Sequence, residues 1–157
     1  MVMKPRFATE LLDAIVADAA ASPHREICGL LLGQDNTVLS HLPARNVAAD
    51  PTVAFEIDPA TLITAYRRQR AGGVRILGCY HSHPSGSPEP SSRDAASAEP
   101  NGWLWLIVTP TDARLWRAVP DGCVHGRFDP VAFACASLGD PPRDDGLEED
   151  ADDRQPG

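Results

Sequence analysis

Residues 74–94 read VRILGCYHSHPSGSPEPSSRD, and they say more about the fold than any other part of the sequence. The first seven residues form a short apolar run of the kind found in buried strands, and His81 follows directly. Side chains two residues apart on an extended segment point to the same face, so His81 and His83 are predicted to aim at one point. A loop rich in proline, serine and glycine follows, and a brief helix is expected to begin near Asp94.

This pattern supplies two imidazoles and one carboxylate, which together predict a metal site. Catalytic zinc sites keep three protein ligands and leave the fourth position to water, whereas structural sites close all four positions, usually with cysteines. None of the four cysteines has suitable spacing, so His81, His83 and Asp94 indicate a catalytic site. Each part of the pattern also has a simpler interpretation. The two histidines can be ordinary surface residues, and Ser91 and Asp94 can form a helix-capping box.

Outward from this stretch, the periodicity of apolar residues predicts helices alternating with strands, and hence a mixed α/β fold with a central sheet flanked by helices. A hairpin is expected near the N-terminus. The second helix is expected to start at Pro59 with Asp58 as its N-cap, to point Leu62, Ile63 and Tyr66 inward, and to end at Gly72-Gly73. The expected helices span about 7–21, 59–71 and 92–98, and the expected strands 27–32, 37–42, 53–57, 74–80, 103–108, 113–119 and 123–128.

Length and charge indicate one domain over residues 1–138, followed by an acidic tail over 139–157 that is expected to be disordered. The whole chain of 157 residues carries a formal charge of −8, and the tail holds eight acidic residues and two arginines, which leaves about −2 for the domain. A nearly neutral body argues against nucleic acid as a partner. No signal peptide or membrane span is recognised, so a cytoplasmic protein with buried free thiols is expected.

The segment over residues 81–94 begins His-x-His-Pro, and ten residues separate His83 from Asp94, which ends a Ser-x-x-Asp sequence. This pattern resembles the signature of the JAMM (MPN-plus) metallopeptidases. That signature also requires a glutamate before an upstream apolar strand, and Glu26, ahead of ICGLLLG, stands in that place. The resemblance covers about residues 2–130 and implies a cytidine-deaminase-like architecture. It further implies one catalytic zinc with a bound water, held by His81, His83 and Asp94. Glu26 would be the general base, and Ser91 would stabilise the oxyanion.

The resemblance is to the compact prokaryotic members of that family, because only eight residues separate Asp94 from Trp103. Resemblance to those members implies that the substrate is a small ubiquitin-like, β-grasp sulfur-carrier protein, which is cut after its C-terminal Gly-Gly. Three alternatives remain open at this point. They are a peptidase for small peptides or amide metabolites, a DNA-associated protein like the RadC type, and a non-catalytic MPN scaffold.

Overall fold

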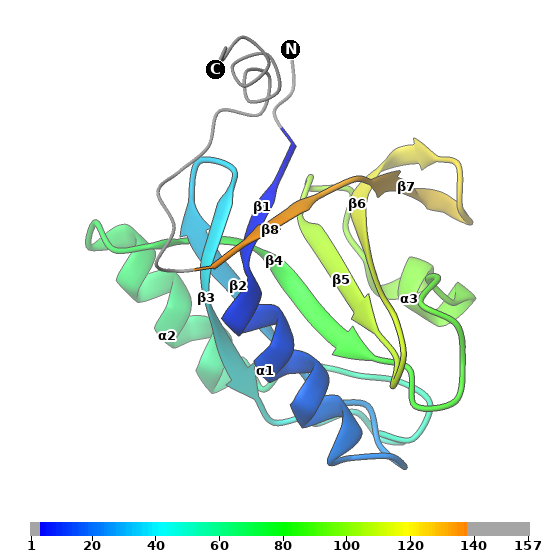
Figure 1. The fold of residues 1–157 in the computed structure, drawn as a ribbon. Coiled ribbons are helices and arrows are strands. Elements are labelled where there is room, and N and C mark those ends of the chain that lie inside the picture. The colour runs from blue at the N-terminus through cyan, green and yellow to red at the C-terminus, as the bar shows by residue number, and fades with distance from the viewer. Residues whose placement is uncertain (1–3, 138–157) are drawn as a thin grey trace, which may run out of the picture.

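The computed structural model describes residues 4–137, which form one mixed sheet with three helices (Figure 1). The strands are paired in the order β7-β6-β5-β4-β2-β3-β1-β8. β4 and β5 are parallel, β1 is parallel to both of its neighbours, and the other pairs are antiparallel. This confirms the predicted fold class. The elements are β1 (Arg6–Ala8), α1 (Thr9–Ala20), β2 (Cys28–Gln34), β3 (Thr37–Ala44), α2 (Pro59–Arg70), β4 (Arg75–Ser82), α3 (Ser92–Ser97), β5 (Leu104–Val108), β6 (Ala113–Gly122), β7 (Gly126–Val131) and β8 (Ala134–Ala136).

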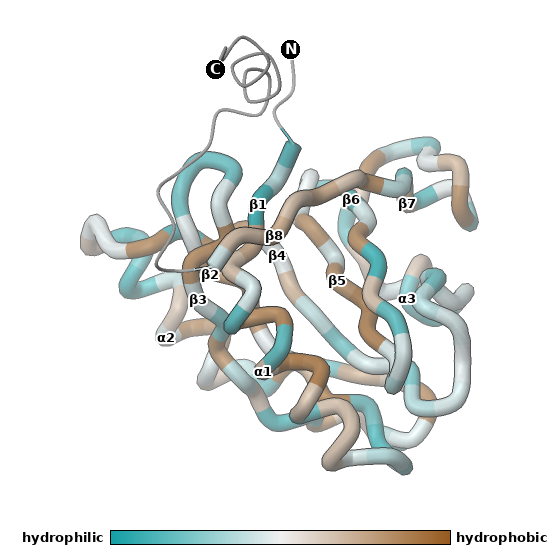
Figure 2. The backbone as a smooth tube through the Cα atoms, viewed as in Figure 1, coloured by the Kyte–Doolittle hydropathy of each residue, from teal (hydrophilic) through white to brown (hydrophobic). Residues whose placement is uncertain are grey.

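Apolar side chains fill both faces of the sheet. On one face, the buried side of α1 packs against alternate residues of the strands, among them Leu31, Tyr80 and Leu106. On the other face, residues of α2 and of the end of α3 pack with Leu30 and Trp105. β5 is buried on both sides, which explains its uninterrupted apolar sequence and its colour in Figure 2. Within residues 4–137, no helix is both long and apolar enough to cross a membrane.

The second helix begins as its sequence predicts. The Asp58 side chain accepts a hydrogen bond from the Ala60 N–H at 3.3 Å, and Pro59 occupies the first helical turn. Gly72 follows the helix with a φ of +93°, a conformation that glycine adopts without steric strain. The prediction of its inward face is wrong in part. Ile63 and Tyr66 are exposed and Leu62 is half-buried, because α2 turns Ala65 toward the sheet.

The predicted strand over residues 53–57 is wrong, because only Ile57 makes a bridge, with Asn46. Beside this bridge, the Asn46 side chain supplies further bonds: its amide donates to the carbonyl oxygens of Glu26 and Ala54, and its oxygen accepts from Glu56 N–H. These bonds satisfy the local backbone without a sheet ladder.

Four further differences concern the sheet edges and the thiols. β1 takes two residues from the start of the predicted first helix, and the last hairpin turns around His125, whose φ is 53°, so that β7 starts later than predicted. β8 was not predicted from the sequence. All four cysteines are free, as predicted, but Cys123 and Cys135 are exposed rather than buried. The predicted acidic tail lies outside the described residues.

Close packing of β4 against β5 gives a test of the fold. A Cβ built on Gly78 would lie 1.9 Å from the backbone oxygen of Leu104, which the sheet cannot move aside. We therefore expect Gly78→Ala to lower the free energy of unfolding by about 2 kcal/mol or more, the scale of overpacked cores. In the control Gly86→Ala, the nearest atom to the new Cβ is 3.6 Å away, so little change is expected. Equal denaturant midpoints for the two variants would contradict this packing.

Candidate metal centre

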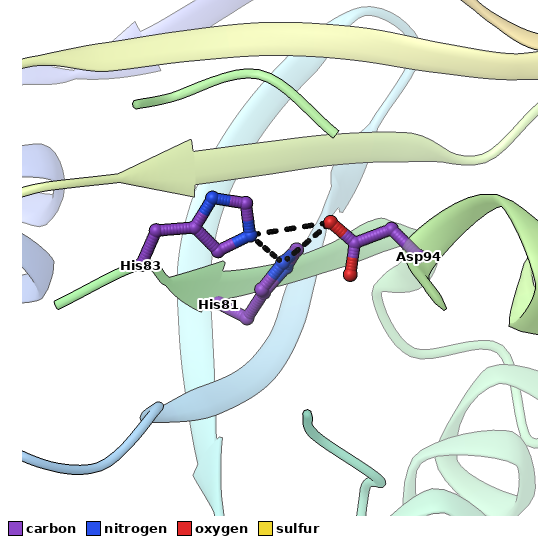
Figure 3. A group of neighbouring side chains, drawn as sticks. All are labelled: His81, His83 and Asp94. Carbon is purple, nitrogen blue, oxygen red and sulfur yellow. Dashed lines mark hydrogen bonds and ion pairs between the residues drawn. The ribbon is translucent and has the colours of Figure 1, made fainter. Parts of the chain in front are cut away.

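Three predicted ligands meet where β4 ends and α3 begins (Figure 3). Nε2 of His81 lies 3.0 Å from Nε2 of His83, and both nitrogens lie 3.2 Å from Oδ2 of Asp94. His81 and Asp94 are buried, and His83 is half-buried at the site's open side. The structure therefore brings together the His-x-His pair and the carboxylate that the sequence predicts.

The spacing of these atoms fits one bound metal ion. A tetrahedral zinc with bonds of about 2.0–2.1 Å holds its ligand atoms about 3.3 Å apart, close to the three separations observed here. With neutral imidazoles, the two nitrogens and Oδ2 supply mainly lone pairs, which repel one another unless a cation lies between them. The cluster can hold a metal, and its two histidines and one carboxylate are a typical zinc donor set.

Backbone groups orient these ligands. The carbonyl oxygen of Ser87 lies 2.8 Å from Nδ1 of His83, which places a proton on Nδ1 and leaves the Nε2 lone pair facing the cluster. Ser91 N–H donates to Oδ2 of Asp94, and Ser91 Oγ accepts from Asp94 N–H, both at 3.0 Å. Ser91 and Asp94 therefore form the capping box considered above, and this box also fixes the carboxylate.

The electrostatics of the three ligands follow from burial and their mutual contacts. Burial lowers the pKa of His81 below its ordinary value. Burial alone would also lower the pKa of His83, but hydrogen bonds with Asp94 and the Ser87 carbonyl raise it overall. Burial would raise the pKa of Asp94, yet the hydrogen bonds with both histidines hold it well below its usual range. Asp94 is therefore a carboxylate, the form that binds metal.

Glu26 lies beside the cluster because of the way β2 pairs with β4. Cys28 is the antiparallel partner of His81, and Ser82 N–H donates to the carbonyl oxygen of Ile27 at 3.1 Å. The same register places Glu26 opposite His83 and on the same face of the sheet. Ser82 ties these strands together by accepting a hydrogen bond from Ile27 N–H at 2.9 Å.

The Glu26 carboxyl is buried, and its Oε1 has no hydrogen-bond partner among residues 4–137. Burial raises its pKa to about 7, against the opposing effect of His83. A carboxyl group with this pKa exchanges its proton near neutral pH, which is the property required of a general base.

One anchoring residue was not recognised in the sequence. Trp116 is buried in the apolar cluster, and its indole N–H also donates to the carbonyl oxygen of Pro88 at 3.0 Å. Arg114 lies over the Trp116 ring at 5.0 Å and pairs with Glu89 at 3.6 Å. β6 therefore holds the loop between His83 and Asp94. A contact between residues 28 positions apart leaves no local sequence signal.

Fold and site together define a JAMM-type domain. A profile of the family described as prokaryotic homologs of the JAB domain matches residues 8–119. The chain belongs to this family, which confirms the resemblance seen in the sequence.

Three relatives support this assignment. A desampylase of Haloferax volcanii is 39% identical over 99 residues, which are 62% of this chain and 70% of that protein. A probable TtuB-protein conjugate cleaving protease of Thermus thermophilus is 34% identical over 113 residues, or 71% of this chain and 74% of the other. The tail tip assembly protein K of Escherichia phage N15 is 33% identical over 111 residues, which cover 71% of this chain but only 43% of the phage protein.

Solved structures share the fold. A solution structure of a protein from Desulfitobacterium hafniense superposes with a TM-score of 0.70 at 23% identity and covers 84% of this chain and 92% of that one. A structure described as a JAMM metalloprotease-like zinc site in the proteasome and signalosome gives a TM-score of 0.52 at 16% identity, with 86% of this chain and all of the other covered.

The contact between Trp116 and Pro88 predicts a loss of metal affinity without loss of fold. Trp116→Phe keeps a buried ring but removes the N–H, so the Ser87–Pro88 backbone is no longer held and His83 loses its fixed orientation. We expect zinc affinity to fall by about 10- to 100-fold, the usual effect of removing an outer-shell partner. Competition with a chelator measures it. Trp103→Phe, at a half-buried indole of the same apolar cluster, is the control. Equal zinc affinity of the two variants would contradict the anchoring role.

The raised pKa of Glu26 predicts how stability depends on pH. Its ordinary value is 4.5 and the folded value is about 7, so between these values the folded state binds more protons than the unfolded state. The free energy of unfolding of metal-free protein should therefore fall as pH rises from about 4.5 to about 7. Glu26→Gln removes this effect and should raise the melting temperature, relative to the unmodified chain, more at pH 8 than at pH 5.

Thermal unfolding in the presence of a chelator measures this difference, with exposed Glu99→Gln as the control. An equal shift for Glu26→Gln at both pH values would show that its carboxyl is not perturbed.

Proposed function

We propose that this chain is a zinc-dependent peptidase that cuts the amide bond after the C-terminal Gly-Gly of a small ubiquitin-like β-grasp protein or its conjugate. The observation that carries the proposal is the convergence of His81, His83 and Asp94 beside a buried carboxyl, that of Glu26. The family membership and the two relatives named as enzymes acting on protein conjugates support it.

His81, His83 and Asp94 would hold the zinc, in keeping with the spacing of their ligand atoms. A bound zinc supplies a Lewis acid that lowers the pKa of its water from 15.7 to about 7. Glu26 would take the proton of the attacking water as its oxygen bonds to the glycine carbonyl carbon. When the carbon–nitrogen bond breaks, Glu26 would return that proton to the leaving amine. A buried carboxyl with a pKa of about 7 suits both transfers.

Ser91 would act at the oxyanion. Its Oγ accepts the capping hydrogen bond from Asp94 N–H, which leaves its own O–H free to rotate and donate. A hydroxyl so placed at the start of α3 is adjacent to the carboxylate ligand and can stabilise negative charge on the substrate oxygen.

A Gly-Gly tail suits the open side of this site. The tail carries no side chains, so it can approach closely and pair with exposed backbone by strand addition. The short connection from Asp94 to Trp103 holds no inserted recognition domain, in keeping with a small folded partner rather than a long chain of them.

The direct test is hydrolysis of a β-grasp carrier that bears one extra residue after Gly-Gly, followed by intact mass. We expect Glu26→Gln to keep its fold and its zinc while losing at least about 10²-fold in rate, because the general base is removed but no ligand is. Glu10→Gln, on α1 at the opposite face, is the matched control and should remain active. His81→Ala should lose most of the zinc as well as the activity.

The outcomes separate the competing functions. A zinc-loaded protein that cuts neither carriers nor simple peptides would support a non-catalytic scaffold. Cleavage of simple peptides alone would support a general peptidase. A fully active Glu26→Gln variant would overturn the role proposed for Glu26 and leave the metal site intact.

A further inference from the structure

A cavity of about 500 Å³ lies beside the metal cluster, between α2, the segment before it and the start of β5. Aromatic and aliphatic side chains form most of its wall. These are Phe55, Ile57, Leu62, Tyr66, Trp103 and Trp105. This volume lies within the range of small-molecule sites and exceeds what a glycine needs.

The cavity and the cluster share two walls. Phe55 stacks on the His81 ring with centroids 4.2 Å apart, and Trp105 meets the same ring edge-on at 5.7 Å. Cys79, which also lines the cavity, precedes His81 by two residues on the same face of β4. A group bound in the cavity is therefore separated from the metal ligands by a single layer of rings.

The charged residues that line the cavity are acidic. Glu56 and Glu99 line it, both exposed to solvent, and no lysine, arginine or histidine among residues 4–137 does. Aromatic faces attract cations, and long basic side chains bury their methylene stems while the charged end stays in water. The lining therefore favours a side chain with an apolar stem and a basic end, and it disfavours an acidic one.

The proposed substrate limits which of its residues can place such a side chain in the cavity. The last two residues of the carrier are glycines and cannot fill a cavity next to the scissile bond. The nearest side chain is that of the residue released as the amine. We propose that this cavity is the subsite for the released residue and that it selects arginine or lysine over glutamate or aspartate. This inference rests on the proposed function.

Carriers ending in Gly-Gly-Arg, Gly-Gly-Leu and Gly-Gly-Glu test the inference in two ways. In the first, they are titrated calorimetrically into the zinc-loaded Glu26→Gln protein, which measures affinity without turnover. In the second, their cleavage by the unmodified chain gives kcat/KM. We expect about tenfold tighter binding and about tenfold higher kcat/KM for the arginine carrier than for the glutamate carrier, with leucine between them.

The double variant Glu56→Gln/Glu99→Gln should reduce the preference for arginine over glutamate to about twofold and leave the leucine carrier unaffected. Glu10→Gln, remote from the cavity, should keep the full preference.

Equal affinity of the arginine and glutamate carriers, or a preference that survives in the double variant, would overturn this inference whether or not cleavage occurs. Failure of the unmodified chain to cleave any carrier is a different outcome, which would overturn the proposed function.

Discussion

The pairing of β2 with β4 is the contact on which the site depends. Because Cys28 is the partner of His81, the residues before β2 run alongside the end of β4, and Glu26 is brought opposite His83. Two hydrogen bonds between Ile27 and Ser82, one in each direction, hold this end of the pair together. A shift of the register by one residue would turn either Glu26 or the two histidines to the α1 face. The register therefore decides whether Glu26, the proposed base, meets the proposed metal ligands.

Asp94, the third proposed ligand, is positioned by the start of a helix rather than by the sheet. Asp94 serves two purposes, since its carboxylate closes the capping box of α3 and also faces the two histidines. The loop that joins His83 to this helix is held by the indole of Trp116. The candidate metal centre thus combines a rigid strand end with a helix start whose position is fixed through β6.

Much of the fold and the meeting of His81, His83 and Asp94 could be predicted because their signals are local. The His-x-His spacing specifies a shared face, and Ser91 and Asp94 stand at capping-box spacing. Glu26 could be found only through a family resemblance, since its approach to His83 depends on strand pairing between segments 55 residues apart.

Where a prediction from the sequence is wrong, a distant or competing contact determines the structure instead. The 53–57 segment has an apolar pattern typical of a strand, but the Asn46 side chain satisfies its backbone. Ile63 and Tyr66 are apolar yet exposed, and Tyr66 lines the cavity beside the site. Nothing in the local sequence distinguishes such a residue from one in the core.

The most direct measurement of the central claim is a crystal structure of the zinc-loaded protein, with anomalous scattering recorded at the zinc edge. We expect one zinc per chain, about 2.0–2.2 Å from Nε2 of His81, Nε2 of His83 and a carboxylate oxygen of Asp94, with Glu26 close by but not bound to it. Zinc held by Cys28 or Cys79, or direct ligation by Glu26 in place of Asp94, would contradict it.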